Sequence, residues 1–142
     1  KADVVIVSSG GFPKDINFIQ SHKAMEHAMG AVKDNGAVIV AGKCEDGLGN
    51  ADFLKWFEHG QSQDMEPHVR KSDKVYAQTA YATRLKAEQC SIFFVSELDD
   101  GSVRKMGLIP KKSIEDAVSA VDDGKDKFCH IIPDGSNTLI TA

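Results

Sequence analysis

The first 23 residues of the chain form the pattern of a buried strand, a glycine turn and a helix. Four apolar residues, Val4 to Val7, lead into Ser9-Gly10-Gly11-Phe12-Pro13, and a helical segment that carries Gln20 and Lys23 follows. A strand that is apolar at every position is typical of a parallel sheet covered on both faces. A tight glycine turn that opens a helix can also bind a small anion. We therefore expect Ser9, Gly10 and Gly11 to position a ligand-binding loop.

Short apolar runs alternate with longer amphipathic segments along the rest of the chain. This alternation predicts an α/β fold with three layers, in which a mostly parallel, Rossmann-like sheet has helices on both faces. The expected strands are Val4–Ser8, Ala37–Ala41, Ser91–Ser96, Met106–Ile109 and Phe128–Ile132, and the expected helices are Asn17–Lys33, Ala51–Glu58, Ser72–Ala87 and Ser113–Val121.

Local signals predict the helix ends. Asn35-Gly36 should end the first helix, Ser72 should cap the third, and Ser113 with Asp116 should form a capping box at the fourth. The polar stretch His59–Lys71, which contains Pro67, is expected to be a connection between helices or a flap.

Composition limits the possible partners. A chain of 142 residues with 42% hydrophobic residues suits one domain, residues 1–142. A net charge of −4 gives no excess of basic residues for a nucleic acid, and no apolar run reaches the roughly 20 residues that cross a membrane. With no signal peptide and three scattered cysteines, we expect a cytoplasmic protein. Lys1 stands where a Met is expected, so we also expect a piece of a longer polypeptide.

Ligands of parallel sheets gather beyond the carboxyl ends of the strands. Polar loops follow four of the expected strands: Ser9–Gly11, Gly42–Gly49, Glu97–Gly101 and Asp134-Gly135. None of them is a complete phosphate motif, because Gly47-Leu48-Gly49 has no third glycine and no G-x-x-x-x-G-K-[ST] is present. A dinucleotide or ATP fingerprint is therefore absent from the sequence.

Gln20 and Lys23 are three residues apart, which places them about 60° apart on one face of a helix. Near the positive end of the helix dipole, an amide and an ammonium could hold a carboxylate. The residues leave a second interpretation open: Gln20 closes a capping box with Asn17, and Lys23 pairs with Glu26 or is solvated.

Other candidates for a site are weaker. Tyr76 is expected to be half-buried, with the alternative that it faces a ligand. His22 lies on the apolar stripe of its helix and is expected to be a hydrogen-bonded core residue, and Cys44 is expected to be structural. The five histidines show no metal-ligand spacing, so we predict no metal site.

Several blocks in order resemble one known family. They are Asp3–Pro13 followed by Gln20-x-x-Lys23, then Gly36–Val40 leading to Cys44–Gly49, and finally Ile131-Ile132-Pro133-Asp134-Gly135. Their combination is similar to the C-terminal domain of the nickel-dependent lactate racemase family, over nearly the whole chain. In that family, the C-terminal domain closes over an N-terminal domain that holds a nickel-pincer nucleotide. The enzyme interconverts 2-hydroxy acid stereoisomers by hydride transfer to and from this cofactor.

The resemblance implies roles for residues of this chain. Gln20 and Lys23 match the family's Q-x-x-K pair, which helps to hold the substrate carboxylate, and Tyr76 is a further substrate-binding candidate. The lysine that tethers the cofactor, the histidine on nickel and the acid/base histidines belong to the N-terminal domain, so no catalytic residue is expected here. The cofactor and the partner domain are therefore expected outside this chain, which should be inactive alone.

One departure bears on the substrate. The lactate-specific enzyme has a tryptophan on the third helix before a T-A-Q segment, and here Val75 precedes Tyr76-Ala77-Gln78. This leaves malate, aromatic hydroxy acids and sugar acids open beside lactate. The rival hypothesis is a free-standing flavodoxin-like or Rossmann-like module that binds a nucleotide or a protein partner.

Overall fold

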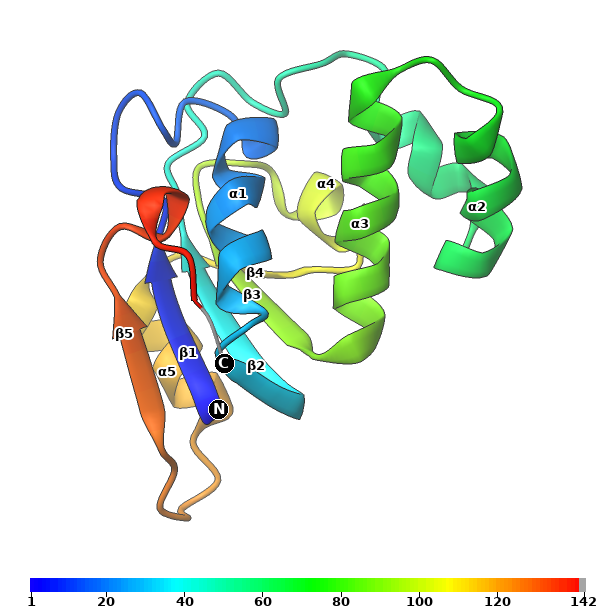
Figure 1. The fold of residues 1–142 in the computed structure, drawn as a ribbon. Coiled ribbons are helices and arrows are strands. Elements are labelled where there is room, and N and C mark those ends of the chain that lie inside the picture. The colour runs from blue at the N-terminus through cyan, green and yellow to red at the C-terminus, as the bar shows by residue number, and fades with distance from the viewer. Residues whose placement is uncertain (141–142) are drawn as a thin grey trace.

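The computed structural model describes residues 1–140 and contains one sheet of five parallel strands in the order β4-β3-β2-β1-β5 (Figure 1). The expected α/β fold with a parallel sheet is confirmed. The strands are β1 (Ala2–Ser8), β2 (Val32–Ala41), β3 (Ser91–Val95), β4 (Ile109–Lys111) and β5 (Cys129–Ile132). The helices are α1 (Phe18–Ala28), α2 (Ser62–Arg70), α3 (Val75–Gln89), α4 (Asp100–Lys105) and α5 (Ile114–Val121), with 3₁₀ segments η1 (Phe53–His59) and η2 (Gly135–Asn137).

Helices cover both faces of the sheet. In Figure 1, α1 and α3 lie in front of the sheet and α5 lies behind it. Val38 and Ile39 are consecutive in β2, and each is fully buried in a different core, because successive strand residues point to opposite faces. This is the reason why the strands are apolar without alternation.

The first helix is shorter than predicted. It ends at Ala28, and β2 already begins at Val32, which is buried and pairs with Ala2 of β1. The prediction that Asn35-Gly36 ends this helix is therefore wrong. Asn35 lies within β2 with a φ of 59°, where the register between β1 and β2 shifts. An apolar residue such as Val32 fits both the helical and the strand pattern, and pairing with β1 decides between them.

The segment predicted as a connection or flap, His59–Lys71, is mostly the helix α2, although Pro67 lies inside it. Contacts with α3 explain the helix, because Ser62 Oγ donates to Glu88 Oε2 over 2.5 Å and Met65 is fully buried. Tertiary packing thus overrides the local cost of a proline. The helix expected at Ala51–Glu58 is the 3₁₀ segment η1.

Two elements near the middle of the chain also differ from the prediction. The expected loop Glu97–Gly101 contains the start of α4, whose first turn Asp99 caps by accepting from Ser102 N over 2.8 Å. The fourth strand begins at Ile109 and not at Met106, because Met106 ends α4 and is fully buried.

The predicted helix caps have mixed outcomes. Ser113 caps α5, since its hydroxyl accepts from Asp116 N over 3.1 Å. This is one half of the predicted capping box, and among the described residues no bond from the Ser113 amide to the Asp116 side chain completes it. Lys74, not Ser72, is the N-cap of α3, and Ser72 Oγ instead accepts from the backbone N of Lys74 over 3.1 Å. Ser72 therefore shapes the turn before α3 without capping the helix.

Candidate functional site at the carboxyl ends of the first and last strands

The order of strands changes direction at β1. The chain steps from β1 through β2 and β3 to β4, and then returns to place β5 on the other side of β1 (Figure 1). Ligands of open parallel sheets bind at such a switch point, outside the carboxyl ends of the strands. The loops that follow β1 and β5 are therefore the first place to look for a site.

The loop after β1 is a tight turn built on glycine. Gly10 and Gly11 have φ values of 92° and 74°, a backbone region that residues other than glycine rarely adopt. The turn is closed by the amide of Lys14, which donates to Gly11 O over 2.8 Å. A Cβ on Gly10 would lie 2.5 Å from Asp134 Oδ1, so this position also lacks room for a side chain.

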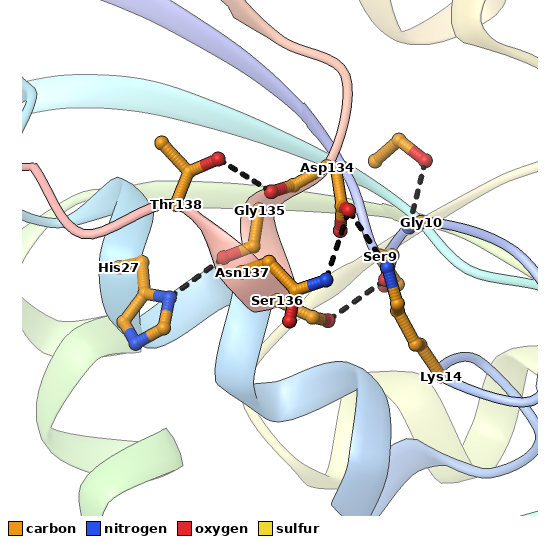
Figure 2. Close-up of polar contacts among 10 residues, drawn as sticks. Ser9, Gly10, Lys14, His27, Asp134, Gly135, Ser136, Asn137 and Thr138 are labelled. Carbon is orange, nitrogen blue, oxygen red and sulfur yellow. Dashed lines mark hydrogen bonds and ion pairs between the residues drawn. The ribbon is translucent and has the colours of Figure 1, made fainter.

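The loop after β5 holds this turn from the other side (Figure 2). Lys14 Nζ donates to Asp134 Oδ2 over 2.7 Å, and Ser136 Oγ donates to Ser9 O over 2.7 Å. His27 Nδ1 lies 2.6 Å from Gly135 O and must be its donor, because a carbonyl only accepts. The two loops and α1 thus form one hydrogen-bonded unit, and we name residues Asp134–Thr138 within it the clamp.

Asp134 is the charged centre of the clamp. The hydrogen bond from Lys14 holds the pKa of the Asp134 carboxyl below its usual value, and Asn137, whose Nδ2 donates to Oδ2 over 3.0 Å, lowers this pKa further. The carboxylate is therefore ionised at neutral pH. Sequence reasoning singled out the Asp134-Gly135 loop by its place after a strand, and assigned no role to the aspartate.

The first three backbone amides of α1 are bonded within the chain. Phe18 N donates to Gly47 O over 3.0 Å, and Ile19 N donates to Leu48 O over 3.3 Å. The amide of Gln20 donates to Asn17 Oδ1 over 3.0 Å, so Asn17 caps α1, which is one half of the capping box that the sequence left open. The Gln20 side chain does not close the box, because its Oε1 accepts from Lys23 Nζ. The amides that a phosphate would use at a helix start are already bonded within the chain.

Gln20 and Lys23 lie together on one face of α1, as their spacing predicts. Lys23 Nζ donates to Gln20 Oε1 over 2.9 Å, the Gln20 side chain is half-buried, and Lys23 is exposed. Within residues 1–140, no carboxylate lies within 4.0 Å of the Lys23 ammonium, whereas Glu26 pairs with Lys86 over 2.5 Å. The predicted alternative of a Lys23–Glu26 ion pair is therefore wrong.

This arrangement can bind an anion through side chains. Because Gln20 Oε1 accepts from Lys23, the amide nitrogen of Gln20 points its donors elsewhere. Lys23 has two further N–H donors and a charge that no carboxylate within residues 1–140 neutralises. A carboxylate placed between the two nitrogens would accept one neutral and one charge-assisted hydrogen bond.

Tyr76 lies apart from this pair in the described contacts. It is the second residue of α3, half-buried, and packs against the larger core. No hydrogen bond of the described residues joins it to Gln20 or Lys23, so its role stays a prediction. Its neighbour Val75 is 80% exposed.

A hollow of about 390 Å³ lies away from this site, near the amino ends of β1 and β2. Asp3, Lys33 and Asn35 are among the residues that line it.

His22 is a buried residue of α1, as expected, but its ring nitrogen is unsatisfied. Within residues 1–140, His22 Nε2 has no hydrogen-bond partner and lies 3.8 Å from Glu26 Oε2. The pKa of His22 is lowered to about 4, chiefly by burial and also by the nearby Lys86 ammonium, while Glu26 acts in the opposite direction. His22 is therefore a neutral core residue and not a base for reactions near pH 7.

This burial predicts a dependence of stability on pH. Because the folded pKa is about 4 and the ordinary value is 6.5, the unfolded state binds more protons between these values. The free energy of unfolding should fall as the pH is lowered from 6.5 to 4, by about 2–3 kcal/mol for His22. Urea unfolding of the chain and of its His22→Gln variant at pH 7 and pH 4.5 measures the difference. A His22 resonance that titrates near 6.5 by NMR would contradict the assignment.

The histidines and Cys44 are the remaining candidates that the sequence raised. Within residues 1–140, no three His, Cys, Asp or Glu side chains come close enough together to hold a metal ion. Cys44 is buried, and this burial raises the pKa of its thiol to about 11, so it is protonated at neutral pH.

Comparisons with known proteins place these residues in context. A family model described as lactate racemase C-terminal domain matches residues 1–140. The lactate racemase of Thermoanaerobacterium thermosaccharolyticum is 29% identical over 147 aligned residues, which cover 98% of this chain and 34% of that protein. The solved structure of the lactate racemase apoprotein from the same organism matches with a TM-score of 0.90 and 29% identity, over 99% of this chain and 36% of that one.

The chain thus spans about a third of the length of these relatives. Within residues 1–140, no helix combines the length and the apolar composition that a membrane span requires.

Proposed function

Because the chain belongs to the lactate racemase C-terminal domain family, we propose that it is the C-terminal domain of a 2-hydroxyacid racemase or epimerase. In this proposal, residues 1–142 close the active site of a longer two-domain protein and bind the carboxylate of the substrate. An N-terminal domain of the same protein is the partner, and a cytoplasmic location stays a prediction.

The observation that carries the proposal is the pairing of Lys23 with Gln20 on an open face of α1. Their hydrogen bond of 2.9 Å holds the ammonium in place, and within residues 1–140 no carboxylate neutralises it. A lysine that is held by an amide and lacks a carboxylate partner suits an anionic ligand that comes from solvent.

The chemistry gives this pair a defined task. Racemisation of a 2-hydroxy acid requires the hydrogen on C2 to leave and to return on either face, while the rest of the substrate stays in place. Gln20 and Lys23 would hold the carboxylate, which is common to both stereoisomers, and would thereby orient C2 without moving a proton. The family resemblance assigns the hydride acceptor to a nickel-pincer nucleotide, which this proposal places on the N-terminal domain.

The rival function, a module that binds a nucleotide at the first helix, has less support. The amides of Phe18, Ile19 and Gln20 are bonded within the chain, so a phosphate would have to displace these contacts. Titration of residues 1–142 with nucleotides tests the rival, and micromolar binding would favour it.

An assay of the full-length protein tests the proposal. The protein, loaded with its cofactor, should convert each enantiomer of a suitable 2-hydroxy acid towards a racemic mixture, as chiral chromatography can follow. Lactate, malate, an aromatic hydroxy acid and a sugar acid form the test panel, because Val75 stands where the lactate-specific enzyme has a tryptophan. Residues 1–142 alone should show no conversion. Absence of conversion with every acid of the panel would contradict the proposal.

A further inference from the structure

Two ion pairs of similar geometry flank β1 and lie at opposite edges of the sheet. Lys14 and Asp134 are 2.7 Å apart, with side chains 35% and 42% exposed, at the carboxyl ends of β1 and β5. Lys33 and Asp3 are 2.8 Å apart, with side chains 51% and 36% exposed, at the amino ends. Asp134 follows β5 in the chain, and Asp3 Oδ2 accepts from the backbone N of Phe128, the residue before β5, over 3.0 Å. Each carboxylate therefore links a residue in or next to β1 with a residue next to β5.

The two carboxylates differ in what they hold. Asp3 joins strand residues far from Gln20 and Lys23, whereas Asp134 holds the turn that leads into their helix. Asp134 Oδ1 is buried against Gly10, where a Cβ would lie only 2.5 Å away, and has no hydrogen-bond partner within residues 1–140. Figure 2 shows this carboxylate between Lys14 and Asn137, next to the glycine turn.

The segment between Lys14 and α1 is held on its other side by the loop after β2. Asp15 O accepts from Cys44 N over 2.8 Å, and Asp15 Oδ2 accepts from Lys43 N over 3.0 Å. Ile16 O accepts from Asp46 N over 2.9 Å. The start of α1 is thus fixed between two loops, and Asp134 provides the charged contact on the β5 side.

We propose that Asp134 is a positioning residue for substrate, which acts through Lys14 and the glycine turn to place Gln20 and Lys23 against the carboxylate. This inference rests on the proposed function of the pair. Asp134 also has an electrostatic effect, because it neutralises the Lys14 ammonium. Lys23 then carries the positive charge that α1 presents to the substrate carboxylate.

Steady-state kinetics of the full-length protein with Asp134→Ala test the inference. The KM for the 2-hydroxy acid should rise about tenfold, because a small displacement of a binding group weakens its contact, while kcat should change less than about threefold. Lys14→Ala should give the same increase in KM, and the double variant should be no worse than either single variant, since both remove one contact. Lys14 is part-exposed, so its variant keeps the test usable if Asp134→Ala fails to fold.

Asp3→Ala is the matched control, because it removes an ion pair of nearly the same length, 2.8 Å against 2.7 Å, from the other end of β1. It should lower thermal stability about as much as Asp134→Ala and leave KM unchanged. An unchanged KM in both Asp134→Ala and Lys14→Ala, or an equal rise in Asp3→Ala, would overturn the positioning role.

The outcome for Lys23→Ala separates this inference from the proposed function. If Lys23→Ala impairs the enzyme and Asp134→Ala does not, the positioning role fails and the carboxylate site stands. If Lys23→Ala has no effect, the carboxylate site and the positioning role both fail.

Discussion

Replacing Lys23 with alanine in the full-length protein should lower kcat/KM for its 2-hydroxy acid about 100-fold. The variant removes the charge that we assign to the substrate carboxylate, and truncating one partner of a desolvated, hydrogen-bonded charge pair costs about 2–5 kcal/mol. Folding should be unaffected, because Lys23 is exposed and its described side-chain hydrogen bond goes to Gln20. Initial rates over a range of substrate concentrations, with each enantiomer in turn, measure the loss.

Two variants make this result specific. Lys23→Arg keeps the charge in a different shape and should recover part of the activity. Lys112→Ala removes another exposed lysine, which pairs with Asp100 over 2.9 Å next to β4, at the far side of the sheet from β5, and should retain full activity. Wild-type kinetics in Lys23→Ala, or an equal loss in Lys112→Ala, would contradict a carboxylate contact at Lys23.

Replacing Phe18 with alanine should cost about 3–5 kcal/mol of the free energy of unfolding. Phe18 is the first residue of α1 and is 0% exposed. Its ring centroid lies 5.6 Å from that of Phe53 in η1 and 5.3 Å from that of Phe94 in β3. The ring therefore joins three elements in the larger core, and its removal leaves a cavity between them. Urea unfolding of residues 1–142, followed by circular dichroism, gives the change.

Phe128→Ala is the control for this prediction. The same side chain is removed from a position that is 58% exposed and whose ring contact is with His130. The free energy of unfolding should therefore fall much less than in Phe18→Ala, by about 0.5 kcal/mol. A loss below about 1 kcal/mol in Phe18→Ala would mean that the start of α1 does not depend on this core contact.

The sequence predicted well those elements whose pattern is local. The apolar run Val4–Val7 lies in β1, the predicted strand Ser91–Ser96 corresponds to β3 (Ser91–Val95), and Ser113 caps α5. Strand burial and helix capping depend on residues a few positions apart. The face shared by Gln20 and Lys23 follows in the same way from helical periodicity, and their hydrogen bond agrees with it.

The predictions failed where distant contacts outweigh a local signal. Pro67 argued against a helix, yet α2 forms because Ser62 bonds to Glu88 on α3 and Met65 is buried. Val32 fitted the helical pattern of the preceding residues, yet it is a strand residue because Ala2 pairs with it. In both cases, a partner more than twenty residues away supplies the deciding energy.

The candidate site also combines features that are local in the sequence with contacts between distant residues. Glycines at a turn, an amide and an ammonium one helical turn apart follow from backbone sterics and helical geometry, so the order of residues was enough to find them. The sequence did not predict the contact between Lys14 and Asp134, which are 120 positions apart. It also did not predict that the α1 amides bond to Gly47 and Leu48. These contacts exist because the sheet places β5 and β2 on either side of β1, and strand order depends on packing across the whole domain.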